Sequence, residues 1–244
     1  PKIYQLDLPV IYEDDQLAVI HKPAGIVVSG NQFHTIQNAL LHNLTVSKAV
    51  DAFQLPRPVH RLDHATSGLL LIAKTTAASI HLSQQFKNKT AQRHYWALVH
   101  GNLSFEQKTI ESFLIRHPKD RKRFCSDKFK TGKFAKTHIT LLQNYLQNVA
   151  WVECKLETGR THQIRVHCKE LAHPILGDIK YSSEKRDKKL SSNELKKIDL
   201  PPTLHLTGIK DDVLGNPIDV ELLRKEAGEH QEGELIIFEY FIFL

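Results

Sequence analysis

A run of five apolar residues, Leu69-Leu70-Leu71-Ile72-Ala73, constrains the fold more than any other part of this 244-residue chain. The run is too short to cross a membrane as a helix and too apolar to lie at the surface, so it predicts a buried strand. Polar residues and turn formers precede it from Pro58 to Gly68. The pattern therefore predicts a polar loop that leads directly into the core of a sheet.

Shorter patterns predict the other elements, without internal repeats. The predicted strands are Val10–Tyr12, Leu17–His21, Ile26–Val28, Tyr95–Val99, Thr137–Leu142 and Val149–Leu156. The predicted helices are Thr35–Leu44, a second that Thr75 or Thr76 caps, and Thr161–Glu170, where the spacing of Ile164 and Val166 also fits a short strand before the helix. These patterns predict an α+β fold with a mostly antiparallel mixed sheet, flanked by helices and loops.

The organisation predicted from the sequence is one domain over residues 1–222. No linker divides this stretch, although Lys180–Pro202 forms a polar insert rich in lysine and serine. Residues 223–244 are predicted to be an acidic and partly apolar extension packed on the domain. This extension fits a core strand, an added edge strand or a dimer contact, and we expect the protein to be a monomer.

Composition excludes several classes of protein. The chain lacks an apolar stretch long enough to span a bilayer, and its first residues form no apolar signal region. Three cysteines without CxxC spacing argue against a disulfide scaffold or a cysteine zinc site. We therefore expect a cytoplasmic protein without a membrane partner.

The formal net charge of +6 is concentrated in one segment. Residues 119–136 carry eight basic and two acidic side chains, whereas residues 211–244 carry nine acidic and two basic ones. Phe124, Phe129 and Phe134 interleave with the cations, a mixture that suits phosphates and unstacked bases as well as a solvated loop. The candidate docking residues are Arg121, Lys122, Arg123, Lys128 and Lys130.

Two polar clusters carry the candidate chemistry. The first, residues 58–68, places Arg61 and Asp63 directly before the apolar run, where an aspartate is a nucleophile, a general base or a turn cap. The second, residues 157–167, has the polar and basic start of a helix, a natural phosphate site. His60 and His64 have the i, i+4 spacing of metal ligands on a helix, but the flanking Pro58 and Gly68 favour a loop, so no metal is predicted.

These clusters resemble the motifs of RluA-type pseudouridine synthases, in a form without the S4 RNA-binding domain. The stretch from His60 to Lys74 (HRLDHATSGLLLIAK) resembles the signature of that family, and three other segments agree with it in order. They are Tyr12–Gly25, Arg93–Gly101 and Thr158–His167, the last followed by His173–Tyr181. The resemblance covers roughly residues 10–222 and implies a catalytic domain with a mostly antiparallel mixed sheet and a central catalytic cleft.

The resemblance implies an isomerase that converts uridine to pseudouridine in structured RNA without a cofactor. Asp63 matches the catalytic aspartate, which either adds to C1′ or removes the ribose 2′ proton. Tyr95 matches the tyrosine that stacks on the uracil, and Arg165 the cation that pairs with the aspartate. The residues assigned to RNA contact and base flipping are Arg61, His60, Arg160, His162 and Leu204.

Two alternatives remain at this stage. One is a non-catalytic RNA-binding or ribosome-assembly factor on the same scaffold. The other is a metal-dependent hydrolase that uses His60, His64 and His162. The predicted partner is a ribosomal or transfer RNA stem-loop, and the residues do not choose between these RNAs.

Overall fold

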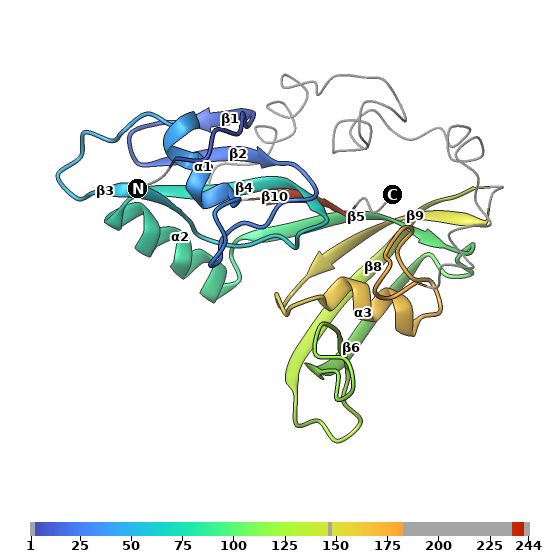
Figure 1. Cartoon of the computed structure of the whole chain (residues 1–244). Helices are drawn as coiled ribbons and strands as arrows, with labels where there is room; N and C mark the ends of the chain where they lie inside the picture. The colour runs from blue at the N-terminus through green and yellow to red at the C-terminus, as the bar shows by residue number, and fades with distance from the viewer. Residues whose placement is uncertain (1–2, 146–147, 183–235, 242–244) are drawn as a thin grey trace. The chain divides into compact units, whose positions relative to one another are not determined.

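The computed structural model describes residues 3–145, 148–182 and 236–241. They divide into two compact units, one that contains the residues up to Gln92 and one that contains Arg93–Ser182, with the C-terminal strand β10 (Ile236–Phe241) formed in the tail. Figure 1 labels the elements of each unit except β7. No helix in the described ranges is long and apolar enough to cross a membrane.

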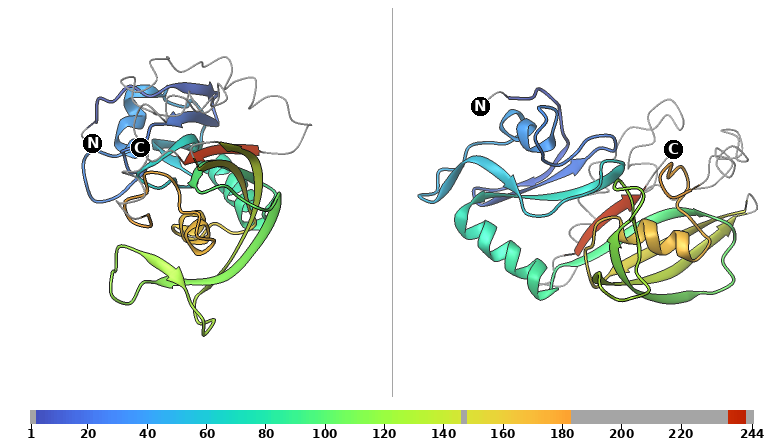
Figure 2. Two further views of the ribbon diagram at one scale, coloured as in Figure 1. Left: turned by 90° about the vertical axis from the view of Figure 1, so that its right-hand side faces the viewer. Right: turned by 60° about the horizontal axis from the view of Figure 1, so that its bottom comes forward.

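The first unit is an antiparallel sheet with a helix on each side (Figures 1 and 2). Its strands are β1 (Val10–Glu13), β2 (Leu17–Lys22), β3 (Ala52–Pro58) and β4 (Thr66–Thr75); β2 pairs with β1 and β4, and β3 pairs with β4. The helices are α1 (Ile36–Asn43) and α2 (Thr76–Asn88), whose N-caps are the hydroxyls of Thr35 and Thr75. All ten residues of β4 are buried, which confirms that the apolar run is a core strand.

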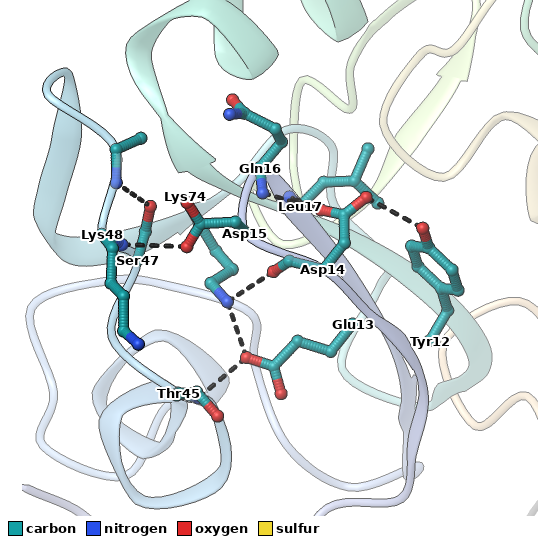
Figure 3. Close-up of polar contacts among 11 residues, drawn as sticks. Tyr12, Glu13, Asp14, Asp15, Gln16, Leu17, Thr45, Ser47, Lys48 and Lys74 are labelled. Atoms are coloured by element: carbon teal, nitrogen blue, oxygen red, sulfur yellow. Dashed lines mark hydrogen bonds and ion pairs between the residues drawn. The ribbon is translucent and has the colours of Figure 1, made fainter.

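The turn between β1 and β2 is tied to the rest of this unit by a polar network (Figure 3). Asp14 Oδ1 accepts the N–H groups of Gln16 and Leu17, which closes the turn. The buried ammonium of Lys74 donates to Glu13 Oε1 at 2.7 Å and to the carbonyl oxygen of Asp14 at 2.6 Å. The acidic turn is therefore held against the end of β4 by a buried cation.

Replacing Lys74 with methionine is expected to lower the free energy of unfolding by about 3 kcal/mol. The methionine fills similar space but leaves Glu13, whose side chain is 21% exposed, without its cation. Urea denaturation measures the change. The control is Lys48→Met, because the Lys48 side chain is exposed and only its backbone N–H joins the network. Equal stability of the two variants would show that the ion pair contributes nothing.

The second unit contains five neighbouring antiparallel strands of the sheet, with one helix against them (Figure 2). Its strands, in the order β5 (Gln92–His100), β9 (Val149–Leu156), β8 (Lys133–Tyr145), β6 (Gln107–Arg116) and β7 (Phe124–Ser126), are all paired antiparallel. The helix α3 (Gln163–Glu170) buries its first six residues and contacts β8 and β7. The antiparallel sheet predicted from the sequence is confirmed.

Two local predictions differ from the structure, and some strands were not predicted. Residues Ile26–Val28 are not a strand: the carbonyl oxygens of Val27 and Val28 accept the N–H groups of Ile36 and Gln37, so the segment caps the start of α1. The chain before α3 is turn and loop, so the short strand considered there is wrong. β3, β6 and β7 were not predicted. The single-domain boundary at residue 222 and the packing of the extension stay predictions.

Candidate active site

Asp63 lies on a loop that runs from the end of β3 to the start of β4. The loop is held at both ends, because Val59 N–H donates to the Leu71 carbonyl and Thr66 N–H donates to the Asp63 carbonyl. Leu62 is buried as an anchor, Asp63 is half-buried and Arg61 is exposed. The loop thus presents a carboxyl group and a guanidinium group from a rigid base.

His60 fixes the first half of this loop. Its Nε2 accepts the backbone N–H of Leu71 at 3.0 Å, and its ring stacks on Phe86 of α2 with the ring centres 5.0 Å apart. These contacts make His60 a support for the loop. Its predicted role in RNA contact stays a prediction.

Lys22 binds the backbone of the same loop. It is fully buried, and its ammonium donates to the carbonyl oxygens of Pro23 and Thr66, each at 2.7 Å, and of His64 at 3.4 Å. Burial lowers the pKa of Lys22 to about 7, and the negative charge of Asp63 acts in the opposite direction. Sequence reasoning predicted only a turn over Lys22–Gly25 and missed this buried cation.

The turn residues after Lys22 contact the loop as well. Gly25 N–H donates to the His64 carbonyl at 2.8 Å, from a backbone with a φ of 85° that favours glycine. The segment Lys22–Gly25 therefore binds the carbonyl groups on the C-terminal side of Asp63. These contacts show that the motif ending at Gly25 supports the loop of the motif that contains Asp63.

Arg165 is buried on α3 in the second unit. Its Nε donates to Asp178 Oδ2 at 2.7 Å and its Nη2 to Asp178 Oδ1 at 2.8 Å, a bidentate pair. Its Cζ lies 4.9 Å from the ring centre of Tyr181. Asp178 and Tyr181 belong to the His173–Tyr181 motif, and their contacts with Arg165 were not predicted.

The other residues predicted at the second cluster surround the start of α3. His162 Nδ1 lies 2.7 Å from the hydroxyl of Tyr181, which also accepts the backbone N–H of Phe124. Arg160 is exposed, and its Nε donates to the Phe134 carbonyl at 2.9 Å. Arg160, His162 and Arg165 therefore belong to one local structure. Leu204 lies outside the described residues.

A buried polar network fixes α3 on the sheet. His167 contacts the hydroxyls of Ser112 and Thr137 at 2.9 and 2.8 Å, and burial lowers its pKa to about 4. Gln163 Nε2 donates to the Lys136 carbonyl and to the Thr137 hydroxyl. The network holds the helix that carries Arg165, and the sequence offered no signal for it beyond polar residues on a buried face.

Tyr95 lies on β5 opposite Cys154 of β9, and it is 7% exposed. Two regular strands fix its position in the second unit. Asp63 and Arg61 belong to the first unit.

The predicted docking segment follows β6 and includes β7. Figure 1 shows its loops in yellow-green at one end of β6 and β8. Arg121, Lys122, Lys128 and Lys130 are exposed, and so is the aromatic ring of Phe129, at 87%. A cavity of about 400 Å³ beside the segment is lined by Arg123, Lys169 and Lys180, among others. Cations and an exposed aromatic ring thus share this surface.

The residues that the structure describes do not support a metal site formed by histidines. Among them, no three His, Cys, Asp or Glu side chains are grouped in a way that could hold a metal ion. In addition, Nε2 of His60 already accepts a backbone N–H, so its lone pair is engaged.

Comparison with known proteins decides the family. A family model described as RNA pseudouridylate synthase matches residues 16–170, which include the Asp63 loop and α3. The chain belongs to the RNA pseudouridylate synthase family. The family that the motifs predict is therefore confirmed.

Relatives within the pseudouridylate synthase family are similar over most of this chain. An uncharacterised RNA pseudouridine synthase of Synechocystis is 43% identical over 182 residues, which are 73% of this chain and 55% of that protein. The ribosomal large subunit pseudouridine synthase D of Neisseria meningitidis serogroup A is 43% identical over 181 residues, 72% of this chain and 46% of that protein. The chain thus spans about half the length of these relatives.

Solved pseudouridylate synthase structures support the same fold. Human RNA pseudouridylate synthase domain containing 1 aligns with a TM-score of 0.63 and 28% identity, over 75% of this chain and 73% of that one. Human RNA pseudouridylate synthase domain containing 4 aligns with a TM-score of 0.60 and 26% identity, over 80% and 77%. The α+β pseudouridine synthase fold predicted from the motifs is confirmed.

Proposed function

We propose that this chain isomerises uridine to pseudouridine in structured RNA, with Asp63 as the catalytic carboxylate. The observation that carries the proposal is the Asp63 loop, where a half-buried aspartate follows the exposed Arg61 by two residues and interacts electrostatically with the buried Lys22 that binds the loop backbone. Membership in the RNA pseudouridylate synthase family supports it. A rigid loop keeps the carboxylate where the sugar of a flipped nucleotide would meet it.

The reaction breaks the bond between C1′ and N1 of the uridine and joins C1′ to C5 of the detached base. The hydrogen on C5 leaves as a proton and N1 gains one, so the product is an isomer of the substrate. Asp63 either adds to C1′ or removes the 2′ proton, and both routes require an ionised carboxylate. We propose that Tyr95 stacks on the uracil and that Arg165 pairs with Asp63.

RNA must release the target base before this chemistry. Extruding a base costs a few kcal/mol of stacking and pairing, which contacts in the vacated position offset. The exposed guanidinium of Arg61, two residues from Asp63, is our candidate for that position. Relatives named for the large ribosomal subunit make ribosomal RNA the first substrate to test, with transfer RNA as the second.

The test uses RNA labelled with tritium at C5 of uridine. Formation of the new bond to C5 releases the label into water, so release reports the isomerisation directly. We expect the purified chain to release tritium from ribosomal or transfer RNA transcribed without modification. Absence of release from both, alongside a pseudouridine synthase that is active on them, would contradict the proposal.

We propose that RNA docks on the basic segment, residues 119–136. Changing Lys122, Arg123, Lys128 and Lys130 to glutamine is expected to weaken RNA binding and to flatten its dependence on salt. Each lost phosphate contact lowers the slope of log K against log salt by about 0.7–0.9, so four lost contacts lower it by roughly 3. Fluorescence anisotropy at several salt concentrations measures the slope.

The matched control for docking changes four lysines outside the basic segment to glutamine. Lys48, Lys87, Lys89 and Lys108 are exposed and lie outside the basic segment. They remove the same net charge, so the control separates local contacts from overall attraction. Equal slopes for the two variants would assign the segment to a solvated loop.

A further inference from the structure

Asp178 has no role in the proposed reaction so far, yet it is fully buried and bonded to Arg165. Its two carboxylate oxygens accept Nε and Nη2 of Arg165 at 2.7 and 2.8 Å. Two parallel bonds to a planar guanidinium fix both the plane and the direction of the group. A single bond would leave the guanidinium free to rotate.

Asp178 is itself held by the backbone around it. Lys180 N–H donates to Asp178 Oδ1 at 3.1 Å, and Asp178 N–H donates to the Ile175 carbonyl at 3.2 Å. Its carbonyl accepts the N–H groups of Tyr181 and Ser182 at 3.0 and 2.7 Å. The residue is therefore part of a tight turn, and its carboxylate is held by a backbone N–H as well as by Arg165.

Tyr181 is the second residue that contacts the guanidinium of Arg165. The ring lies under the guanidinium at 4.9 Å, and its hydroxyl is bonded to the backbone of β7 and to His162. Both bonds to Asp178 use the Nε and Nη2 edge of Arg165. Asp178 therefore does not compete for the Nη1 edge of the guanidinium.

We propose that Asp178 is a positioning residue that fixes the guanidinium of Arg165 in the orientation that the reaction requires. Such a pair contributes little to stability, because two buried charges lose their hydration. Apolar residues of the same size would fill the space without that cost. A fixed guanidinium, in contrast, has no reorganisation to undergo when the reaction begins. This inference rests on the proposed function of Arg165.

The first test measures the orientation itself and does not need activity. In ¹H–¹⁵N spectra, the Nε–H of Arg165 is expected to exchange slowly with solvent in the unchanged protein, because it is buried and bonded. In Asp178→Asn we expect it to exchange at least about 10-fold faster, since the replacement loses a charge-assisted bond. Unchanged exchange would overturn the inference.

The second test is a double-variant cycle on the single-turnover rate of tritium release. Asp178→Asn is expected to lower this rate about 100-fold, the effect of a misplaced reacting group, with an RNA dissociation constant within about 3-fold of the unchanged protein. In an Arg165→Gln background, the same change is expected to alter the rate less than about 3-fold, because Asp178 acts only through Arg165. A full 100-fold effect in that background would overturn the inference.

Loss of folding is separated by a control in the same unit. Asn144→Ala removes two bonds to the backbone of Leu103 without touching α3 or Asp178, so its rate is expected to stay within about 3-fold. If Asn144→Ala loses as much rate as Asp178→Asn at equal folded fraction, the loss reports stability and the inference is overturned. An inactive unchanged protein would instead contradict the proposed function, and the exchange measurement would still decide the inference.

Discussion

Asp63→Asn is expected to lower the rate of tritium release from labelled RNA by at least about 10³-fold, because an amide is neither a base nor a nucleophile. The replacement has nearly the same shape. It keeps the backbone bond from Thr66 N–H to the carbonyl of residue 63, so the loop and its support by Lys22 remain. The loss therefore reports the chemistry of the carboxylate.

Binding separates the catalytic interpretation from the alternative of a non-catalytic RNA-binding factor. We expect Asp63→Asn to bind RNA within about 3-fold of the unchanged protein, since base and phosphate contacts come from other residues. The control is Asp7→Asn, because Asp7 is fully exposed and pairs only with the half-exposed His42 among the described residues. A rate for Asp63→Asn above a tenth of the unchanged rate would show that the carboxylate is not catalytic.

The second large effect is a loss of stability between pH 6.5 and 4. Burial lowers the pKa of His21 and of His167 to about 4, and the charge of Lys22 adds to the effect on His21. Both are neutral in the folded protein above that pH, while the unfolded chain takes up protons below about 6.5. The unfolded state then binds more protons, so the free energy of unfolding falls as the pH falls.

Each histidine contributes up to about 1.4 kcal/mol per pH unit in this window, so the two together lower the free energy of unfolding by roughly 6 kcal/mol at pH 4. Guanidinium denaturation between pH 6.5 and 5 measures the slope, below the pKa of about 7 of Lys22 and above the usual pKa values of carboxyl groups. His21→Leu is expected to remove about half of it, because leucine does not titrate and neither ring nitrogen of His21 has a hydrogen-bond partner among the described residues.

Two further variants complete this test. His167→Gln is expected to remove the other half of the slope, at the expense of bonds to Ser112 and Thr137. Gln84→Ala changes an exposed residue of α2 that does not titrate and is expected to leave the slope unchanged. Identical slopes in the unchanged protein and in His21→Leu would show that His21 is charged or accessible in the folded state.

Local patterns predicted most of the secondary structure because the forces that decide it act over a few residues. The apolar run of β4 and the capping hydroxyls of Thr35 and Thr75 are examples. The segment Ile26–Val28 has the composition of a strand, but its carbonyl groups are used by the start of α1. β3 contains Pro56 and Pro58, which obscure a strand in the sequence.

The sequence by itself determined the family, the loop that carries Asp63, and α3 with Arg165, because each belongs to a contiguous motif. Only the tertiary structure revealed what holds these groups. Lys22 donates to carbonyl groups 42 and 44 residues away, and Asp178 reaches Arg165 across 13 residues. In the sequence both are ordinary charged residues near turns. Both are buried in the folded protein, and a polar or charged group removed from water must bind a partner. The partners that the fold brings to them are the Asp63 loop for Lys22 and the guanidinium of Arg165 for Asp178.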